Sequence, residues 1–191
     1  MRTQIFQFVF ALSLLSAGVN ANAQKIYAPV SLQAGTNEIP DIAGDGKTGS
    51  IVLLRRENGN AWSNDIYIVV AEGSVATYDD GKDVFRDQPH TGEDVITSVR
   101  FAKSDHLGRY TLFALVANRE IVESVPAPAK VSIKTYALIE NDEGLGTPYR
   151  FELASSSLGS QAYCNADMAL KTELGFPLSQ NYEGPTSSKG C

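Results

Sequence analysis

Two acidic turns carry the residues best suited to metal chemistry. Asp79, Asp80 and Asp83 surround a glycine, and Asp41 and Asp45 lie in a second glycine-containing segment. Ca²⁺ takes about six to eight oxygen ligands, and backbone carbonyls can complete a set begun by carboxylates. We therefore expect Asp79, Asp80 and Asp83 to be the first candidates for a structural calcium site. Neither segment has the acid that closes an EF-hand loop, so plain solvated turns are the alternative.

Histidine chemistry depends on His90 and His106, the two histidines of the chain. Both occur in loop-like contexts, and neither has partners at the spacing of a zinc motif. The sequence has no G-x-S-x-G elbow and no β-lactamase S-x-x-K with its companion motifs. Surface or turn positions are therefore expected for both histidines. The alternative is an envelope hydrolase with one of them as its base, which requires a concave pocket near an acid.

The two cysteines, Cys164 and Cys191, most simply form one disulfide in an oxidising compartment. The bond would close a loop of 191 − 164 = 27 residues. Such a loop contributes roughly 3–4 kcal/mol in the chain-entropy treatment. An intermolecular link through Cys191 is the competing interpretation, because chain ends are usually mobile. Nothing near either cysteine would activate a catalytic thiol.

Residues 1–23 have the pattern of an export signal. Arg2 precedes an apolar run from Ile5 to Leu15, and Ala21-Asn22-Ala23 places small residues at a cleavage site. The apolar run is short for a membrane span, and no cysteine follows the site to carry a lipid. We expect residues 24–191 to form a single soluble domain, periplasmic or secreted, without a membrane anchor.

The charge balance argues against nucleic acid as a partner. The chain has 16 Lys and Arg against 22 Asp and Glu, and removal of the predicted signal with its one arginine leaves 15 − 22 = −7. No basic run is present, so the chain lacks the electrostatic footprint of a protein that binds nucleic acid or anionic lipid. The acids are scattered along the chain, as on a solvated surface.

Four strand-like runs between residues 94 and 154 organise the chain. They are DVITSVRFAK, GRYTLFALVAN, KVSIKTYALIEN and PYRFELA. Both alternating sets of the second run are apolar, which predicts a central strand around Leu112 that is covered on both faces. In the last run Tyr149, Phe151 and Leu153 are expected on one face and Arg150 and Glu152 on the other, as in a half-exposed strand. Successive strands without intervening helices predict an all-β, mainly antiparallel β-sandwich.

Shorter elements are expected on either side of these runs. The predicted strands are 51–54, 65–71 and 74–78, with a hairpin turn at 57–60 whose Asn-Gly pair supplies positive φ angles. Pro29 confines the first apolar run to a sheet edge or an extended arm. Residues 84–93 are irregular and are interpreted as a connecting or functional loop. A short C-terminal α-helix is predicted over 166–174, capped by Ser160 or Asn165 and stopped at Gly175.

The segments DVITSVRFAKSDHLGRYTLFALVANRE and AYCNADMALKTELGFPL, with the closing Gly-Cys, resemble the carbapenem intrinsic-resistance proteins of the CarG type. The likeness covers about residues 51–191 and concerns the strand pattern and the C-terminal helix rather than a catalytic motif. It implies an exported β-sandwich that protects by binding and is not an enzyme. It also implies a cation site and a capacity to form homodimers.

The same family is structurally similar to bacterial inhibitors of invertebrate-type lysozyme, so a periplasmic inhibitor of a lysozyme-type enzyme is an alternative function. Those inhibitors insert a loop with a Ser-Gly-x-x-Tyr-like motif into the enzyme's cleft. Here Ser160-Gln161-Ala162-Tyr163 keeps only the two ends of that motif, so no inhibitory residue is carried over. A structural envelope component is a further alternative. No cofactor beyond a structural Ca²⁺ is expected.

Overall fold

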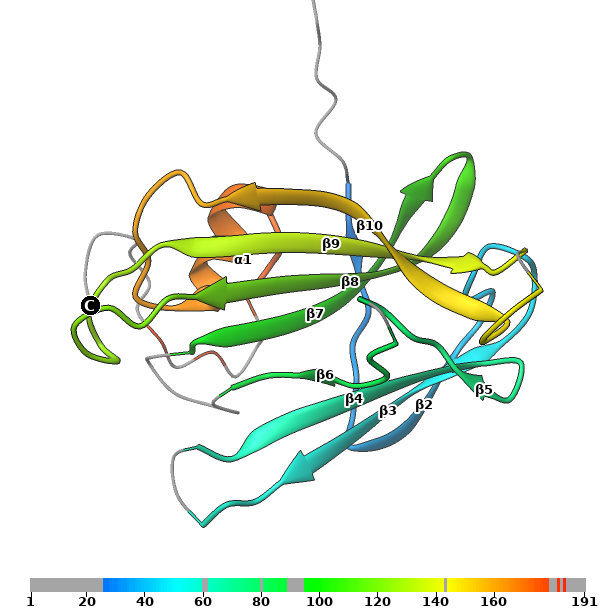
Figure 1. Ribbon diagram of the computed structural model, residues 1–191, viewed down its shortest axis with the longest axis horizontal. Helices are drawn as coiled ribbons and strands as arrows, with labels where there is room; N and C mark the ends of the chain where they lie inside the picture. The colour runs from blue at the N-terminus through cyan, green and yellow to red at the C-terminus, as the bar shows by residue number, and fades with distance from the viewer. Residues whose placement is uncertain are drawn as a thin grey trace, which may run out of the picture.

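A computed structural model describes residues 26–59, 62–79, 81–88, 95–142, 144–178, 182 and 184. These residues form two antiparallel β-sheets that face each other, with one helix on the outer face of one sheet (Figure 1). The fold is thus a β-sandwich with a short helix near the C-terminus, as the sequence predicts. The predicted export signal, Asp80, His90 and Cys191 lie outside the described residues.

Sheet A contains the long strands and has the order β1-β7-β8-β9-β10. Its strands are β1 (Ala28–Pro29), β7 (Thr97–His106), β8 (Arg109–Arg119), β9 (Val131–Glu140) and β10 (Tyr149–Leu158). The four long strands form an antiparallel meander, the expected product of strands joined by short turns. Pro29 lies at the edge of the sheet, where its missing N–H removes no ladder bond.

Sheet B is smaller and carries the order β2-β3-β4-β5, with β6 also paired to β4. Its strands are β2 (Gly35–Ile39), β3 (Gly49–Arg56), β4 (Asn64–Ala71), β5 (Ser74–Val75) and β6 (Phe85–Arg86). β3 and β4 form the predicted hairpin with longer arms than expected, and Gly59 has the predicted positive φ of 67°. β2 was not predicted, because its residues Gly35–Ile39 alternate polar and apolar types only weakly.

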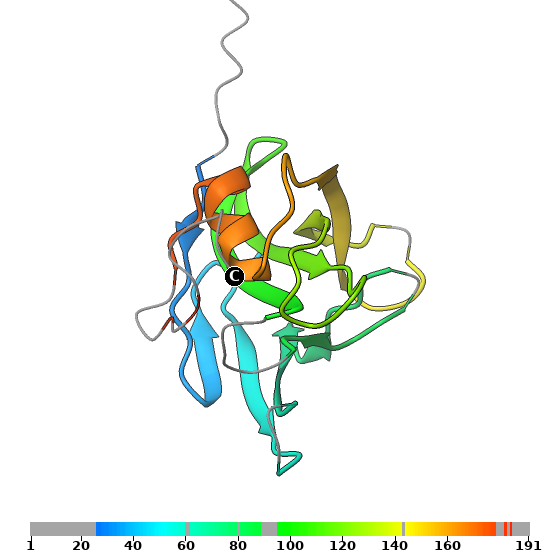
Figure 2. The same cartoon turned by 90° about the vertical axis from the view of Figure 1, so that its left-hand side faces the viewer.

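Two apolar clusters cover the two faces of sheet A. Leu112 is fully buried in the cluster between the sheets, and Phe113 is fully buried in the cluster beneath the helix. The central, doubly covered strand predicted around Leu112 is therefore confirmed as β8. In Figure 2 the helix lies on sheet A, on the side away from β3 and β4.

The helix α1 (Ala166–Leu174) has the predicted bounds. The side chain of Asn165 accepts a hydrogen bond from the N–H of Asp167 at 2.8 Å, and Gly175 ends the helix with a left-handed φ of 67°. Its first five residues, Ala166 to Leu170, are buried against sheet A. None of the helices in the described part of the chain is long and apolar enough to cross a membrane.

Candidate ligand-binding groove

The face of sheet A that looks toward sheet B changes along the strands from apolar to polar. Strand register defines three cross-strand rows on this face: Phe101, Ala114 and Tyr136; Val99, Val116 and Lys134; Thr97, Asn118 and Ser132. Side chains two residues apart on a strand share a face, so the rows are consecutive steps across one surface. Phe101 and Tyr136 in the first row are buried, whereas Lys134 in the second is only half-buried. The packing between the sheets therefore opens toward water at this end.

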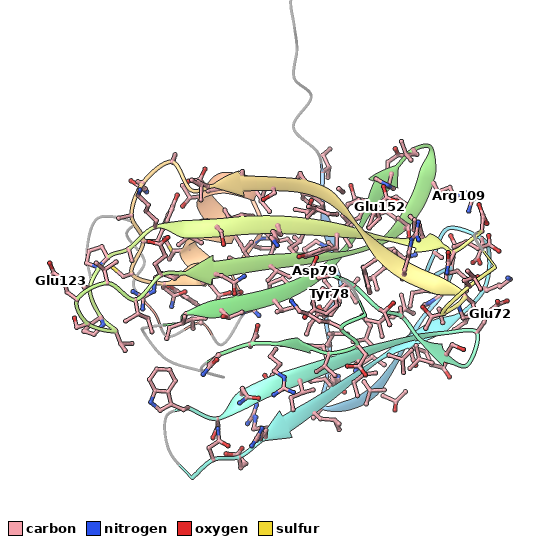
Figure 3. The ribbon with its side chains drawn as sticks, in the orientation of Figure 1. Glu72, Tyr78, Asp79, Arg109, Glu123 and Glu152 are labelled. Carbon is pink, nitrogen blue, oxygen red and sulfur yellow. The ribbon has the colours of Figure 1, made fainter. Side chains whose placement is uncertain are left out.

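The segment between β5 and β6 forms the opposite wall. The rings of Tyr78 and Phe85 stack with their centroids 4.0 Å apart, and Phe85 is buried in the core between the sheets. The hydroxyl of Tyr78 donates to the carbonyl of Val84 at 3.0 Å, and a backbone bridge joins Tyr78 to Lys82. This closed turn holds Asp79 with a left-handed φ of 36°. Figure 3 shows Tyr78 and Asp79 side by side between the two sheets.

A groove of about 550 Å³ lies between these two walls. Its volume is within the usual range for sites that hold small molecules. The lining combines the Tyr78 ring and an apolar floor with three cationic and two acidic side chains. The charged lining residues are Lys82, Arg86, Lys134, Asp79 and Asp83.

One carboxylate oxygen is the centre of the charged cluster. Asp79 Oδ2 accepts a hydrogen bond from the Tyr136 hydroxyl at 2.9 Å. The same oxygen lies 3.8 Å from Lys82 Nζ and 3.7 Å from Lys134 Nζ. Burial, reinforced by the hydrogen bond to Asp79, raises the pKa of the Tyr136 hydroxyl. The hydroxyl therefore keeps its proton at neutral pH and remains a donor.

The structure places the predicted calcium residues in this groove only in part. Asp79 and Asp83 line it, and Asp80 lies outside the described residues. Two ammonium groups already neighbour Asp79, and no group of three acidic, histidine or cysteine side chains suited to a metal occurs among the described residues. Whether Asp80 completes a calcium site stays a prediction.

The second acidic turn is held by bonds within the protein. Asp41 accepts a hydrogen bond from the N–H of Gly46 at 2.6 Å. Asp45 accepts bonds from the N–H of Lys47 at 3.0 Å and from the Tyr149 hydroxyl at 2.5 Å. These bonds give the carboxylates of this loop donors within the protein, and whether an ion also binds here stays a prediction.

His106 does not line the groove. It ends β7, nine residues along the strand from Thr97 in the groove wall, a separation of roughly 30 Å at the usual rise per residue. Its ring contacts Phe113 edge-on with centroids 5.8 Å apart, in the packing beside the helix layer. His106 is therefore not beside the acids of this groove, and His90 is outside the described residues, so the hydrolase alternative stays a prediction.

The segment Ser160–Tyr163 is fastened to the helix. Glu173 Oε1 accepts hydrogen bonds from the N–H and the hydroxyl of Ser160, both at 2.6 Å, and from the Tyr163 hydroxyl. The Tyr163 residue is fully buried. Of the two ends of the inhibitor-like motif, Tyr163 is thus part of the core, whereas Ser160 is exposed but hydrogen-bonded to the helix. Cys164 next to them is also buried, and its pairing with Cys191 stays a prediction because Cys191 is not described.

A second charged cluster, which the sequence did not indicate, joins the helix to both sheets. Arg100 on β7 bonds Asp87 at 2.7 Å and Asp167 at 2.6 Å. Asp87 also accepts from the Tyr67 hydroxyl at 2.9 Å, and Asp167 accepts from the Ser98 hydroxyl at 2.5 Å. Burial works against the charge of Arg100, but the two carboxylates outweigh it and raise the pKa of the guanidinium. Its carboxylates are buried and the Arg100 side chain is only 22% exposed, so this cluster is structural.

Comparison with known proteins supports the fold. A solved structure titled "Crystal structure of CarG" matches with a TM-score of 0.61, covering 76% of this chain and 94% of that chain at 19% identity. No family model matches the chain, and no curated protein matches it. The protein therefore has a CarG-like β-sandwich fold. At this identity the likeness concerns the fold alone.

Proposed function

We propose that the protein is an exported, non-catalytic binding protein with a protective role, and that the groove between sheet A and the β5–β6 segment is its ligand site. The observation that carries the proposal is the groove itself. It offers about 550 Å³, a Tyr78 wall and a cationic rim at the end of the sandwich where the inner face of sheet A becomes polar. The CarG-like fold supports a protective role that resembles carbapenem intrinsic resistance. Residues 1–23 support export to the periplasm or the medium.

Two features favour binding over the alternatives. His106 lies apart from the groove, so the described residues offer no histidine base beside the acids there. The buried Tyr163 and the bonded Ser160 are not available to enter another enzyme's cleft, which disfavours lysozyme inhibition through that segment. A binding protein requires neither a general base nor an inserted loop.

The test is native mass spectrometry of residues 24–191 with a carbapenem and, separately, with an invertebrate-type lysozyme. We expect a retained, unmodified carbapenem adduct, and an unchanged antibiotic concentration after prolonged incubation. Steady loss of the antibiotic would show catalysis and overturn the proposal. A lysozyme complex without an antibiotic adduct would favour the inhibitor alternative. Failure to retain either would remove the protective role.

Self-association is part of the same proposal and is measured in the same spectra. β10 is the last strand of sheet A, and among the described residues only its start is bridged, by Thr77 at Arg150. From Leu153 to Leu158 the strand is exposed and uncharged. An open edge without charges is suited to pairing with a second copy. We expect a dimer that Ser156→Pro disrupts, because proline removes a donor and distorts the edge.

A further inference from the structure

We propose that the groove binds a small molecule with an anionic oxygen group, a carboxylate or a phosphate, attached to an apolar body, and that Asp79 occupies the anion position when the groove is empty. The proposal rests on the proposed function, since it names the ligand class of that same site. The Lys134 and Lys82 ammonium groups hold the anion, and the Tyr78 ring and Val116 contact the apolar part.

The position of Asp79 shows where the groove stabilises negative charge. Its Oδ2 atom receives the Tyr136 hydroxyl and lies within ion-pair distance of both ammonium groups. The two N···O distances of 3.7 and 3.8 Å exceed those of hydrogen bonds. Each ammonium therefore keeps its donors, and neither lysine donates a side-chain hydrogen bond to another described residue. A second oxygen anion can take these donors without breaking a bond inside the protein.

The charge of the lining favours an anion over a cation. Among the described lining residues, three cationic and two acidic side chains give 3 − 2 = +1, in a chain whose net charge is −6. The Arg86 guanidinium is exposed at the rim and forms no ion pair with any other described residue. A locally positive recess on an acidic protein concentrates anionic ligands and repels them elsewhere.

Neutral donors extend the site along sheet A. The Asn118 Oδ1 atom accepts the Thr97 hydroxyl at 3.0 Å, which fixes the side-chain amide and leaves its N–H₂ group as a donor in the lining. Asn118 is one row away from Lys134 on the same face. An anionic group on Lys134 can therefore be accompanied by a carbonyl or hydroxyl on Asn118.

The experiment is calorimetric titration of residues 24–191 with three probes of one size: benzoate, phenyl phosphate and benzamide. We expect at least one anion to bind about tenfold more tightly than neutral benzamide, the usual weight of a charge-assisted hydrogen bond. The tighter of the two anions identifies a carboxylate or a phosphate ligand. Equal affinity for benzamide, or saturable binding of neither anion, would overturn the proposal.

Matched lysine variants locate the anion. Lys134→Met should weaken the anion about tenfold and leave benzamide unchanged, and Lys134→Arg should restore binding. Lys130 is exposed just before β9 and does not line the groove, so Lys130→Met carries the same charge change as a control. If Lys130→Met weakened anion binding as much as Lys134→Met, the effect would come from the overall charge of the protein. This result would overturn the proposed anion site at Lys134.

Removal of the Asp79 carboxylate should change the affinity for the anion in the opposite direction. Asp79→Asn frees both ammonium groups and should strengthen anion binding severalfold; unchanged or weaker binding contradicts the role of Asp79. Failure of the proposed protective function can be distinguished from failure of the proposed ligand class, because these probes measure binding in the groove without an antibiotic or a lysozyme. If the parent protein and Lys134→Met bound a carbapenem equally well, the protective function would stand, but the groove would not be the site at which the carbapenem binds.

Discussion

Two charged clusters of this protein each combine cationic side chains with aspartate and a tyrosine hydroxyl, and they differ in packing. In the Arg100 cluster the guanidinium lies 2.7 and 2.6 Å from its two carboxylates, and the side chains of Asp87 and Asp167 are 5% and 8% exposed. In the Asp79 cluster the ammonium groups lie 3.8 and 3.7 Å from one carboxylate, and Lys82 is 63% exposed. The first cluster is mostly buried, with Arg100 22% exposed, whereas the second is open to water.

The difference shows which charges serve the fold and which can serve a ligand. A buried carboxylate needs all its partners in place, because water cannot replace them. A half-exposed lysine near a carboxylate contributes little to stability and can exchange its partner at little cost. We therefore expect substitutions in the Arg100 cluster to change the free energy of unfolding, and those in the Asp79 cluster to change binding.

The largest effect is expected for Arg100→Met. This change leaves Asp87 and Asp167 buried without their cation, and removal of one partner from a buried ion pair costs about 3–5 kcal/mol. Urea denaturation measures the loss. Lys82→Met makes the same charge change in the groove and should lower stability by less than about 0.5 kcal/mol. Similar denaturation midpoints for Arg100→Met and Lys82→Met would mean that the two clusters do not differ in their contribution to stability.

Leu112→Ala sharpens the comparison on the apolar part of the same sheet face. Leu112 is fully buried between the sheets, so truncation should cost about 2–5 kcal/mol through lost burial and a cavity. Leu158→Ala on the exposed end of β10 serves as the control, with an expected change below about 0.5 kcal/mol. An unchanged denaturation midpoint for Leu112→Ala would mean that β8 is not central.

Asp79→Asn should change stability by less than about 1 kcal/mol, because the Tyr136 hydroxyl can still donate to the amide oxygen. The same variant tests the predicted calcium site. If Asp79, Asp80 and Asp83 bind Ca²⁺, a chelator should lower the melting temperature of the parent protein and leave that of Asp79→Asn unchanged. Equal melting temperatures of the parent with and without chelator would contradict a structural calcium ion.

The smallest effect concerns Glu173, a carboxylate held by neutral donors. Partial burial opposes its charge, but hydrogen bonds from Ser160 and Tyr163 outweigh burial and lower its pKa. A lowered pKa in the folded state stabilises the protein above the unfolded pKa, and this contribution disappears as the pH falls through the folded value. Glu173→Gln should therefore lose up to about 1 kcal/mol at pH 7. The difference in the free energy of unfolding between the parent and Glu173→Gln should shrink on acidification. A difference that is independent of pH would contradict the lowered pKa of Glu173.

Much of the fold could be predicted because its signals are local. The helix bounds followed from Asn165 and Gly175, whose capping roles depend on their immediate neighbours. The double apolar alternation around Leu112 identified the central strand, because side chains on a strand alternate between faces. Leu153 shows the limit of this pattern. It has the spacing of Tyr149 and Phe151, yet it is 47% exposed and lies where the register between β9 and β10 shifts.

The candidate groove was only partly accessible from the sequence. The segment 84–93 was interpreted as an irregular connecting or functional loop; part of it forms β6, and Val84, Phe85, Arg86 and Gln88 line the groove together with Asp79 and Asp83. Lys134 gave no signal, because a single lysine in an apolar strand is typical of a solvated face. The position of Lys134 in the groove depends on the pairing of β9 with Val116 on β8. It also depends on the path of the segment that contains Asp79, more than fifty residues earlier in the chain.

The sequence by itself determined the types of the elements, the central strand and the helix, because hydrophobic alternation and capping act over a few residues. Tertiary structure alone decided which charges are buried and which remain open. The Arg100 cluster joins β7 to Asp87 and to the helix, and the Asp79 cluster joins the β5–β6 segment to β9. Both clusters depend on strand register and on how far one sheet covers the other. These are long-range consequences of packing that the local pattern does not contain.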